Sequence, residues 1–378
     1  MRIGILTDLC LPHISGITVF VDMYRRTLQS MGHEAHVISF GPAGRRGAYP
    51  FVHRTPGLPL GRSGFFINIR HASHCQRLIR SMDLLHVMHP FLSGSLAFRY
   101  RRSASTPVVF TAQTRYDLYL RHTLPAPARP AAWLFLRAYL PGFCRRCALV
   151  IAPSDAGVSM LRGLGVKGLP QVIPNAVDCS RFQPSVMFRG RRIRAVYIGR
   201  LAPEKNLPFL LRAFSLAAAR CPALELQLVG DGPERQRLEA LARELKTDSR
   251  IRFLGARPHG ELPALLGGCD LFLTASTTEV HPLSLIEAMA AGLPAVGIAG
   301  EGIAETVCDG ESGLLSKNDP ADFAEAIVRL AEDPELGRRL SESAAHAAQA
   351  YDIRRVTRLH LEQFAALVPP QGAAGVAR

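Results

Sequence analysis

Two glutamates, Glu279 and Glu287, are separated by seven residues around the predicted start of a helix. Pro282 follows a polar loop and opens a run of helix formers that stops at Gly292, so the pattern predicts a helix from Pro282 to Ala291. The first amides of such a helix have no partner within it and attract phosphate. One acid beside that end and another deeper in the site suit a sugar nucleotide. The same spacing also occurs in amphipathic helices with one solvated and one structural glutamate.

A second segment carries two cations, Arg200 and Lys205, in a loop between a predicted strand and a predicted helix. Arginine offers a fixed fork of donors and lysine a compact charge, so the two suit the charge that builds on a departing diphosphate. The glycines that follow three consecutive predicted strands permit close backbone approach to a ligand, and they are Gly199, Gly230 and Gly255. Asp231 has an alternative role as a helix N-cap before Pro233.

The composition is that of a globular protein, with 378 residues, 48% hydrophobic and 20% charged. No apolar run approaches the roughly 18 to 20 residues that cross a bilayer. The first residues read as a strand rather than a cleaved leader, so we expect a cytoplasmic protein. Of eight cysteines, only Cys144 and Cys147 form a C-x-x-C pair, which without a second pair favours reduced thiols over a metal site.

The net charge of +14 is concentrated in the first half: residues 1–184 carry +15, almost entirely from arginine, and the remainder carries −1. This distribution favours an anionic surface, although a solvated basic face has the same composition. The segment Arg129–Arg146 is predicted to be a helix on which Trp133, Phe135 and Tyr139 alternate with arginines. It is either a packed helix or a membrane-facing amphipathic element. We find no nucleic-acid-binding motif and expect no nucleic acid partner.

Short apolar segments alternate with helix patterns in both halves, which predicts two parallel, doubly wound sheets with ligands off the carboxyl ends of the strands. The predicted strands are 2–7, 36–40, 84–88, 107–111, 148–152, 171–173, 193–198, 225–229, 251–253, 271–274 and 295–298. The predicted helices are 17–31, 68–81, 94–102, 129–146, 154–161, 206–220, 233–245, 260–266, 282–291, 320–331, 335–349 and 353–367. The segment 41–64 is predicted as a loop.

Taken in order, these segments resemble the retaining nucleotide-sugar glycosyltransferases of the GT-B fold, specifically glycosyltransferase family 4. The likeness spans nearly the whole chain and is carried by Pro12–Gly16, Ile151–Ser154, Val172–Asp178, Phe182, Gly199–Asn206, Gly230–Arg235, Phe253–Gly255, Glu279–Glu287 and Ala288–Pro294. Through His89–Phe91 and Thr111–Tyr119, the first half is most similar to members that glycosylate diacylglycerol or phosphatidylinositol lipids.

The resemblance implies an α/β GT-B fold of two Rossmann-like, doubly wound domains facing a central cleft. An acceptor-side domain would span 1–184 and a donor-binding domain 185–352. The helix at 353–368 would pack back on the first domain, and 369–378 would be a disordered tail. The implied protein lies peripherally at the inner face of the cell membrane, binds an anionic membrane surface and acts on a lipid or sugar acceptor.

The resemblance also implies the roles of individual residues. The residues nearest the chemistry would be Arg200, Lys205 and Glu279, with the two cations on the diphosphate and the glutamate on donor-sugar hydroxyls. The residues that would bind the rest of a UDP- or GDP-sugar, with Glu287 on the ribose, are Gly16, Gly199, Gly230, Asp231, Gly255, His281, Pro282, Leu283, Ser284 and Glu287. The acceptor-side residues would be His89, Gln113, Arg115 and Tyr116.

The implied hexosyl transfer keeps the donor's anomeric configuration and uses no metal and no other cofactor. The sequence also lacks an Asp-x-Asp pair, the usual ligands of a metal-bridged diphosphate. Two positions depart from the family pattern: Gln113 stands where a histidine is usual and cannot titrate, and Pro282 stands where glycine is common. If His281 reaches the donor sugar, hexose selectivity would change.

Three alternatives stay open from the sequence. The acceptor could be a soluble molecule or a polysaccharide instead of a lipid. A nucleotide-sugar epimerase would share the two-domain architecture, although the two cations and the glutamate pair argue against it. The departures at Gln113 and Pro282 would also suit a sugar-nucleotide binder without catalytic activity.

Overall fold

The computed structural model describes residues 1–378 except 14, 43–50, 60–64, 118–124, 185–191 and 369–378. The chain forms two compact units. Apart from the undescribed segment 121–123, the first unit combines the chain up to Pro174 with the part from Ile353 onward, and the second comprises Asn175–Asp352. Residues 175–184 therefore lie in the second unit, whereas the predicted boundary placed them in the first. The predicted tail at 369–378 lies outside the described residues.

The first unit is built on a parallel sheet of seven strands in the order β3-β2-β1-β6-β7-β8-β9. Their bounds are Arg2–Leu6 (β1), Glu34–Phe40 (β2), Val52–Thr55 (β3), Leu84–Val87 (β6), Val108–Thr111 (β7), Leu149–Ala152 (β8) and Gln171–Val172 (β9). Strand order reverses on either side of β1, as in a doubly wound fold. The prediction of a loop over 41–64 was wrong for β3 and for β4 (Leu58–Pro59), which pairs with β5 (Phe66–Ile67).

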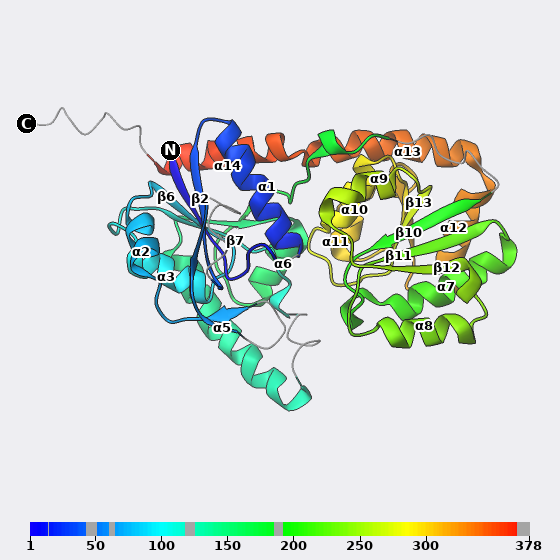
Figure 1. The fold of residues 1–378 in the computed structure, drawn as a ribbon, viewed down its shortest axis with the longest axis horizontal. Helices are drawn as coiled ribbons and strands as arrows, with labels where there is room; N and C mark the ends of the chain where they lie inside the picture. The colour runs from blue at the N-terminus through cyan, green and yellow to red at the C-terminus, as the bar shows by residue number, and fades with distance from the viewer. Residues whose placement is uncertain (14, 43–50, 60–64, 118–124, 185–191, 369–378) are drawn as a thin grey trace, which may run out of the picture. The chain divides into compact units, whose positions relative to one another are not determined.

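The helices of the first unit are α1 (Gly16–Ser30), α2 (Ser73–Arg80), α3 (Leu92–Tyr100), α5 (Arg129–Arg146), α6 (Asp155–Gly163) and α14 (Ile353–Leu367). Helix α2 begins five residues later than predicted, and the side-chain amide of Asn68 donates to the Pro56 carbonyl at 2.6 Å. Helix α14 packs on α1, where the rings of His360 and Tyr24 lie 5.1 Å apart. This contact places the last helix in the core of the first unit (Figure 1).

The second unit has a parallel sheet of six strands in the order β12-β11-β10-β13-β14-β15. Their bounds are Ile193–Ile198 (β10), Leu224–Val229 (β11), Ile251–Gly255 (β12), Leu271–Thr274 (β13), Ala295–Ile298 (β14) and Gly313–Ser316 (β15). The helices are α7 (Leu207–Arg220), α8 (Arg235–Glu244), α9 (Leu262–Leu266), α10 (Leu283–Ala290), α11 (Glu301–Ala304), α12 (Pro320–Glu332) and α13 (Pro334–Ala348). The sequence patterns missed β15 and α11, which are four residues long.

The order of this second sheet also reverses, between β10 and β13. In doubly wound sheets, ligands bind beyond the carboxyl ends of the strands at this switch point. The loop after β10 carries Arg200 and Lys205, and the loop after β13 carries Glu279. The fold thus brings the predicted cations and the first predicted acid to one end of the sheet. Figure 1 shows these loops beside α10 and α11.

Candidate functional site

The loops after β10, β11 and β12 are joined by backbone hydrogen bonds in the second unit. The Leu201 amide donates to the Asp231 carbonyl at 3.0 Å, and the Gly230 amide donates to the Gly255 carbonyl at 2.9 Å. Gly230 has a φ of +137°, and a Cβ at this position would lie 1.9 Å from the Gly199 carbonyl oxygen. The glycine is therefore required by loop packing within the protein, a reason that the sequence did not reveal.

Asp231 does not act as the helix cap considered from the sequence. Helix α8 begins at Arg235, and Glu234 stands at its N-cap position without a side-chain cap bond. Asp231 instead accepts from the Gly232 amide at 2.8 Å and pairs with Arg235 at 3.5 Å. The carboxylate is exposed, so its predicted contact with the donor stays a prediction.

Lys205 and Glu279 form an ion pair across the switch point, with Nζ 2.5 Å from Oε1. The two side chains are only 24% and 17% exposed. Their loops are joined by the Thr278 hydroxyl, which donates to the Glu204 carbonyl at 3.1 Å. The sequence predicted both residues near the reacting centre, and the structure brings their charges together.

Arg200 pairs with Glu204 in the same loop, and its guanidinium is the most exposed charge of this group, at 59%. Burial raises the pKa of Glu204, but hydrogen bonds from its own backbone and Arg200 and the charges of Arg200 and Lys205 outweigh this effect. The pKa of Glu204 therefore lies below its usual range. An ionised Glu204 therefore holds one arm of the Arg200 guanidinium, while the rest of this side chain stays exposed.

Helix α10 begins directly after Pro282, which stands at its N-cap position. The Ile286 amide makes the bond to the Pro282 carbonyl, so the amides of Leu283 and Ser284 precede the hydrogen bonds of the helix. Such amides can receive an anion. The fold therefore retains the phosphate-binding potential predicted for this end.

His281, also predicted near the donor, is buried within the second unit. Its ring lies 4.8 Å from that of Tyr351, and its backbone carbonyl accepts from the Asn175 amide group at 2.9 Å. Burial lowers the pKa of His281 to about 4, so the imidazole is neutral at pH 7. The structure thus gives this side chain a packing partner, and its contact with a donor sugar stays a prediction.

Glu287 lies on α10 and is 5% exposed. Its Oε1 atom lies 2.6 Å from His259 Nε2, and Arg181 in turn contacts His259 Nδ1 at 3.0 Å. Sequence reasoning missed both His259 and Arg181, because they are far from the glutamate motif along the chain. Because the arginine and the histidine lie on separate loops, no fixed spacing in the sequence links them to Glu287.

Gly302, at the start of α11, is a further residue that the sequence did not reveal. A Cβ on Gly302 would lie 2.2 Å from the Glu279 carbonyl oxygen and 2.8 Å from that of Val280. Helix α11 can therefore approach the Glu279 loop only with glycine at this position. The contact between Gly302 and the Glu279 backbone fixes the position of the Glu279 Cα atom.

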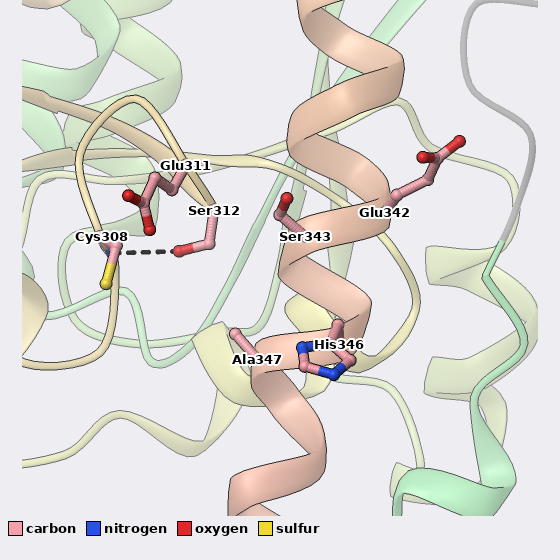
Figure 2. A pocket seen from close by; sticks show the side chains of 7 residues that line it. All are labelled: Cys308, Glu311, Ser312, Glu342, Ser343, His346 and Ala347. Carbon is pink, nitrogen blue, oxygen red and sulfur yellow. Dashed lines mark hydrogen bonds between the residues drawn. The ribbon is translucent and has the colours of Figure 1, made fainter.

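A hollow of about 400 Å³ in the second unit lies between the 308–312 loop and α13, apart from the predicted site residues. It is lined by Cys308, Glu311, Ser312, Glu342, Ser343, His346 and Ala347. Figure 2 shows Ser312 accepting from the Cys308 amide at its edge, at 3.0 Å. Its lining includes two glutamates and no arginine or lysine, which does not suit a phosphate.

The switch point of the first unit lies between β1 and β6, where Asp8 and His89 follow these strands. The Asp8 amide donates to His89 Nδ1 at 3.2 Å, and the Asp8 carboxylate accepts from the Ser93 amide at 2.8 Å and from its hydroxyl. Burial lowers the pKa of His89 despite the opposing charge of Asp8. His89, predicted on the acceptor side, is therefore a buried neutral imidazole.

The other predicted acceptor-side residues lie after β7. Arg115 is held by Asp117 through two hydrogen bonds of 3.0 and 2.9 Å. Tyr116 is 5% exposed, packs edge-on against Phe91, and has a hydroxyl without a partner in the described structure. Gln113 is half-buried. The contact of these three residues with an acceptor stays a prediction.

Gly16, predicted near the donor phosphate, is the exposed first residue of α1. Ser15 caps this helix by accepting from the Thr18 amide at 3.3 Å. Among the residues that the structure describes, no group of three or more His, Cys, Asp or Glu side chains could hold a metal ion. The residues described also include no helix that is long and apolar enough to cross a membrane.

Two family models match most of the chain. The model described as glycosyl transferases group 1 matches residues 181–347, and the model described as Glycosyltransferase Family 4 matches residues 14–181. Together they cover both units, including the predicted donor residues of the second unit and the acceptor-side residues of the first.

The similar curated proteins include an alpha-monoglucosyldiacylglycerol synthase of Acholeplasma laidlawii, 27% identical over 93% of this chain and 93% of that protein. A GDP-mannose-dependent alpha-mannosyltransferase of Corynebacterium glutamicum is 27% identical over 88% of this chain and 80% of that protein. Among solved structures, Anabaena Alr3699/HepE in complex with UDP-glucose superimposes with a TM-score of 0.76. It is 22% identical and the match covers 97% of this chain and 100% of that chain, so the two share a fold.

Proposed function

Because the chain belongs to the GT-B glycosyltransferases, as a member of family 4, and is an enzyme of this class, we propose that it moves a hexose from a UDP- or GDP-sugar to a membrane lipid. The hexose is glucose or mannose, and the acceptor is a diacylglycerol, phosphatidylinositol or glycolipid hydroxyl. Transfer retains the anomeric configuration and needs no metal ion. The names of the similar glucosyldiacylglycerol synthase and mannosyltransferase support this choice of donor and acceptor.

The observation that carries the proposal is the ion pair of Lys205 and Glu279 at the switch point of the second sheet, 2.5 Å apart. An ammonium group has three donors, so Lys205 can hold the glutamate and still bind diphosphate oxygens. Glu279 keeps a second oxygen that can accept from sugar hydroxyls. The pair thereby offers neighbouring binding groups for the diphosphate and for the sugar, the two parts of the donor that separate during transfer.

The proposed reaction forms a bond between the acceptor oxygen and the anomeric carbon of the donor. The bond from that carbon to the diphosphate oxygen breaks, and the proton of the acceptor hydroxyl passes to the departing diphosphate. Arg200, Lys205 and the amides of Leu283 and Ser284 stabilise the negative charge that develops on this leaving group. Attack from the face of the leaving group retains the configuration.

Helix α5 provides the surface that we propose for membrane binding. This helix packs into the core through Leu136, Leu140 and Phe143, whereas Leu134 is 69% and Phe135 55% exposed. Figure 1 shows the first turns of α5 extending away from the sheet of the first unit. Exposed apolar side chains among arginines, on the half of the chain that carries +15, suit an anionic bilayer surface.

The function is tested by incubating the purified protein with UDP-glucose, UDP-galactose or GDP-mannose and a bacterial lipid extract. We expect one donor to yield a hexosylated lipid by mass spectrometry, with an α-anomeric proton by nuclear magnetic resonance and no loss of activity in EDTA. A β-anomer contradicts retention, and inhibition by EDTA contradicts metal independence. Donor binding without any product favours a sugar-nucleotide binder, and epimerised donor favours an isomerase.

Membrane binding is tested separately by flotation with vesicles. We expect binding to vesicles containing anionic lipid that weakens with salt, and at least tenfold weaker binding for L134D/F135S. Equal binding to neutral vesicles would show that charge does not guide the contact. As a matched control, L359D changes another exposed leucine, on α14, and should bind as the native protein does.

A further inference from the structure

Three side chains of the second unit form a continuous hydrogen-bonded chain that ends on α10. Arg181 contacts His259 Nδ1 at 3.0 Å and donates to the His259 carbonyl at 3.3 Å. His259 Nε2 lies 2.6 Å from Glu287 Oε1. The three residues come from η2 (Cys179–Arg181), η5 (His259–Glu261) and α10. Segments far apart in sequence are thus arranged around one carboxylate.

The contacts define the tautomer of the imidazole. A guanidinium can only donate, so His259 Nδ1 must accept from Arg181 and cannot carry a proton. The proton of the neutral ring therefore lies on Nε2 and is donated to Glu287. Arg181 acts on Glu287 through the ring and fixes which nitrogen faces the carboxylate.

The geometry also fixes the orientation of Glu287. The residue is 5% exposed, and its Oε1 atom is engaged by His259. Within the described part of the chain, Oε2 has no hydrogen-bond partner. A nearly buried carboxylate with one oxygen held and one free can accept from a neighbouring pair of hydroxyls. Without the imidazole, the side chain could rotate away from this orientation.

We propose that His259 is a positioning residue for nucleoside recognition: with Arg181 it holds Glu287 so that Oε2 accepts from the ribose hydroxyls of the donor. This inference rests on the proposed function, because it takes a nucleotide as the ligand. His259 touches neither the diphosphate nor the sugar that is transferred. Its loss therefore weakens nucleotide binding and leaves the rate at saturating donor close to that of the native enzyme.

Two substitutions at one position separate the proposal from a general packing role. In H259Q the amide nitrogen can reach the place of Nε2 and still donate to Glu287, whereas the shorter side chain of H259N cannot. We expect Kd for UDP or GDP, whichever the native protein binds, to rise about tenfold in H259N and less than threefold in H259Q. H346N, at a histidine on α13 outside the chain of contacts, serves as the control and should bind normally.

The ligand provides a second test that a folding defect would not reproduce. By calorimetry, the native protein should bind the 2′,3′-dideoxy form of the nucleotide about tenfold more weakly than the normal form. H259N should bind both forms equally, and combining it with E287A should add no further loss. Nitrogen nuclear magnetic resonance of labelled histidine should show a bare Nδ1 and a protonated Nε2 at His259.

The outcomes distinguish this inference from the proposed function. A native protein that binds neither UDP nor GDP overturns both. A native protein that binds one of them, but with an affinity that does not change with the ribose hydroxyls or with H259N, overturns the inference alone. A fall in kcat for H259N with unchanged KM for the donor also overturns it, because this would place His259 in the chemical step.

Discussion

The two sheets carry polar groups at equivalent places, but the groups differ in kind. At the switch point of the first unit, Asp8 and His89 are joined by hydrogen bonds in a buried environment, and the imidazole is neutral. At the switch point of the second, Lys205 and Glu279 are a partly exposed pair of full charges. Buried groups that are held by hydrogen bonds specify a structure, whereas partly exposed charges can exchange partners with a ligand. The comparison favours the second unit as the proposed place for the charged part of the donor.

The largest expected effect comes from removing the charge at the second switch point. K205A should lower kcat/KM for transfer by roughly a hundredfold to a thousandfold, the range for a group that stabilises charge in a transition state. E279A should have a similar effect through the donor sugar. The measurement is the initial rate of hexosyl transfer to the lipid acceptor.

Loss of another ion pair in the same unit provides the control for this experiment. R220A breaks the contact of Arg220 with Glu325, which lies between α7 and α12 and is exposed. Its activity should match that of the native enzyme, because this exposed pair is screened by water and salt and includes none of the predicted site residues. Transfer that survives K205A and E279A would remove the distinction between the two switch points.

Acid should destabilise both units through buried histidines, and one histidine in each unit serves as the test. Burial lowers the pKa to about 4 for His281 in the second unit and, against a hydrogen bond with Val356, for His360 in the first. The unfolded chain therefore binds more protons between pH 6.5 and 4. Stability is fully present above pH 6.5 and falls by up to about 3 kcal/mol per histidine as the pH approaches 4.

H281F and H360F test this acid dependence one unit at a time by urea unfolding at several pH values. Each variant should lose less stability than the native protein between pH 7 and pH 4. At pH 8 the histidines are neutral, so any difference there reports packing alone. Parallel pH profiles for the native protein and both variants would contradict the proposed cause.

Gly302 offers a structural test of how the Glu279 loop is held. G302A would place a Cβ 2.2 Å from a backbone carbonyl that cannot move independently. We expect a loss of about 1–3 kcal/mol in the free energy of unfolding, together with reduced transfer. In contrast, G163A adds a Cβ on α6 with nothing within 4 Å and should preserve stability. Equal melting curves for the two variants would argue against the close contact.

The smallest expected effect is that of Y116F in the first unit. The Tyr116 hydroxyl is buried without a partner among the described residues, so its removal should change stability by less than about 1 kcal/mol. If the residue only packs in the core, transfer is also unchanged. A clear rise in KM for the lipid acceptor would instead support the acceptor contact implied by the resemblance.

The sequence predicted the alternation of strands and helices well, because parallel strands are buried on both faces and read as short apolar runs. It also predicted Lys205 and Glu279 in one site from local motifs, and the structure pairs the two side chains, while their role in transfer stays a prediction. It did not reveal β15 or α11, which are too short to show a period. His259, Arg181 and Gly302 were missed for a different reason: their roles depend on contacts between distant segments. The alternative role of Asp231 as a helix N-cap was wrong, because the residues typical of a helix cap are also typical of a turn.

The return of α14 to the first unit has a consequence for synthesis of the protein. The chain must complete the second unit before the helix that covers Tyr24 on α1 is made. During synthesis, the part of the first unit's core that α14 covers therefore stays exposed until the second unit has been made. The second unit does not need α14 in order to fold. Shortening the chain at Asp352 should consequently expose α1 to proteolysis and leave the second unit resistant.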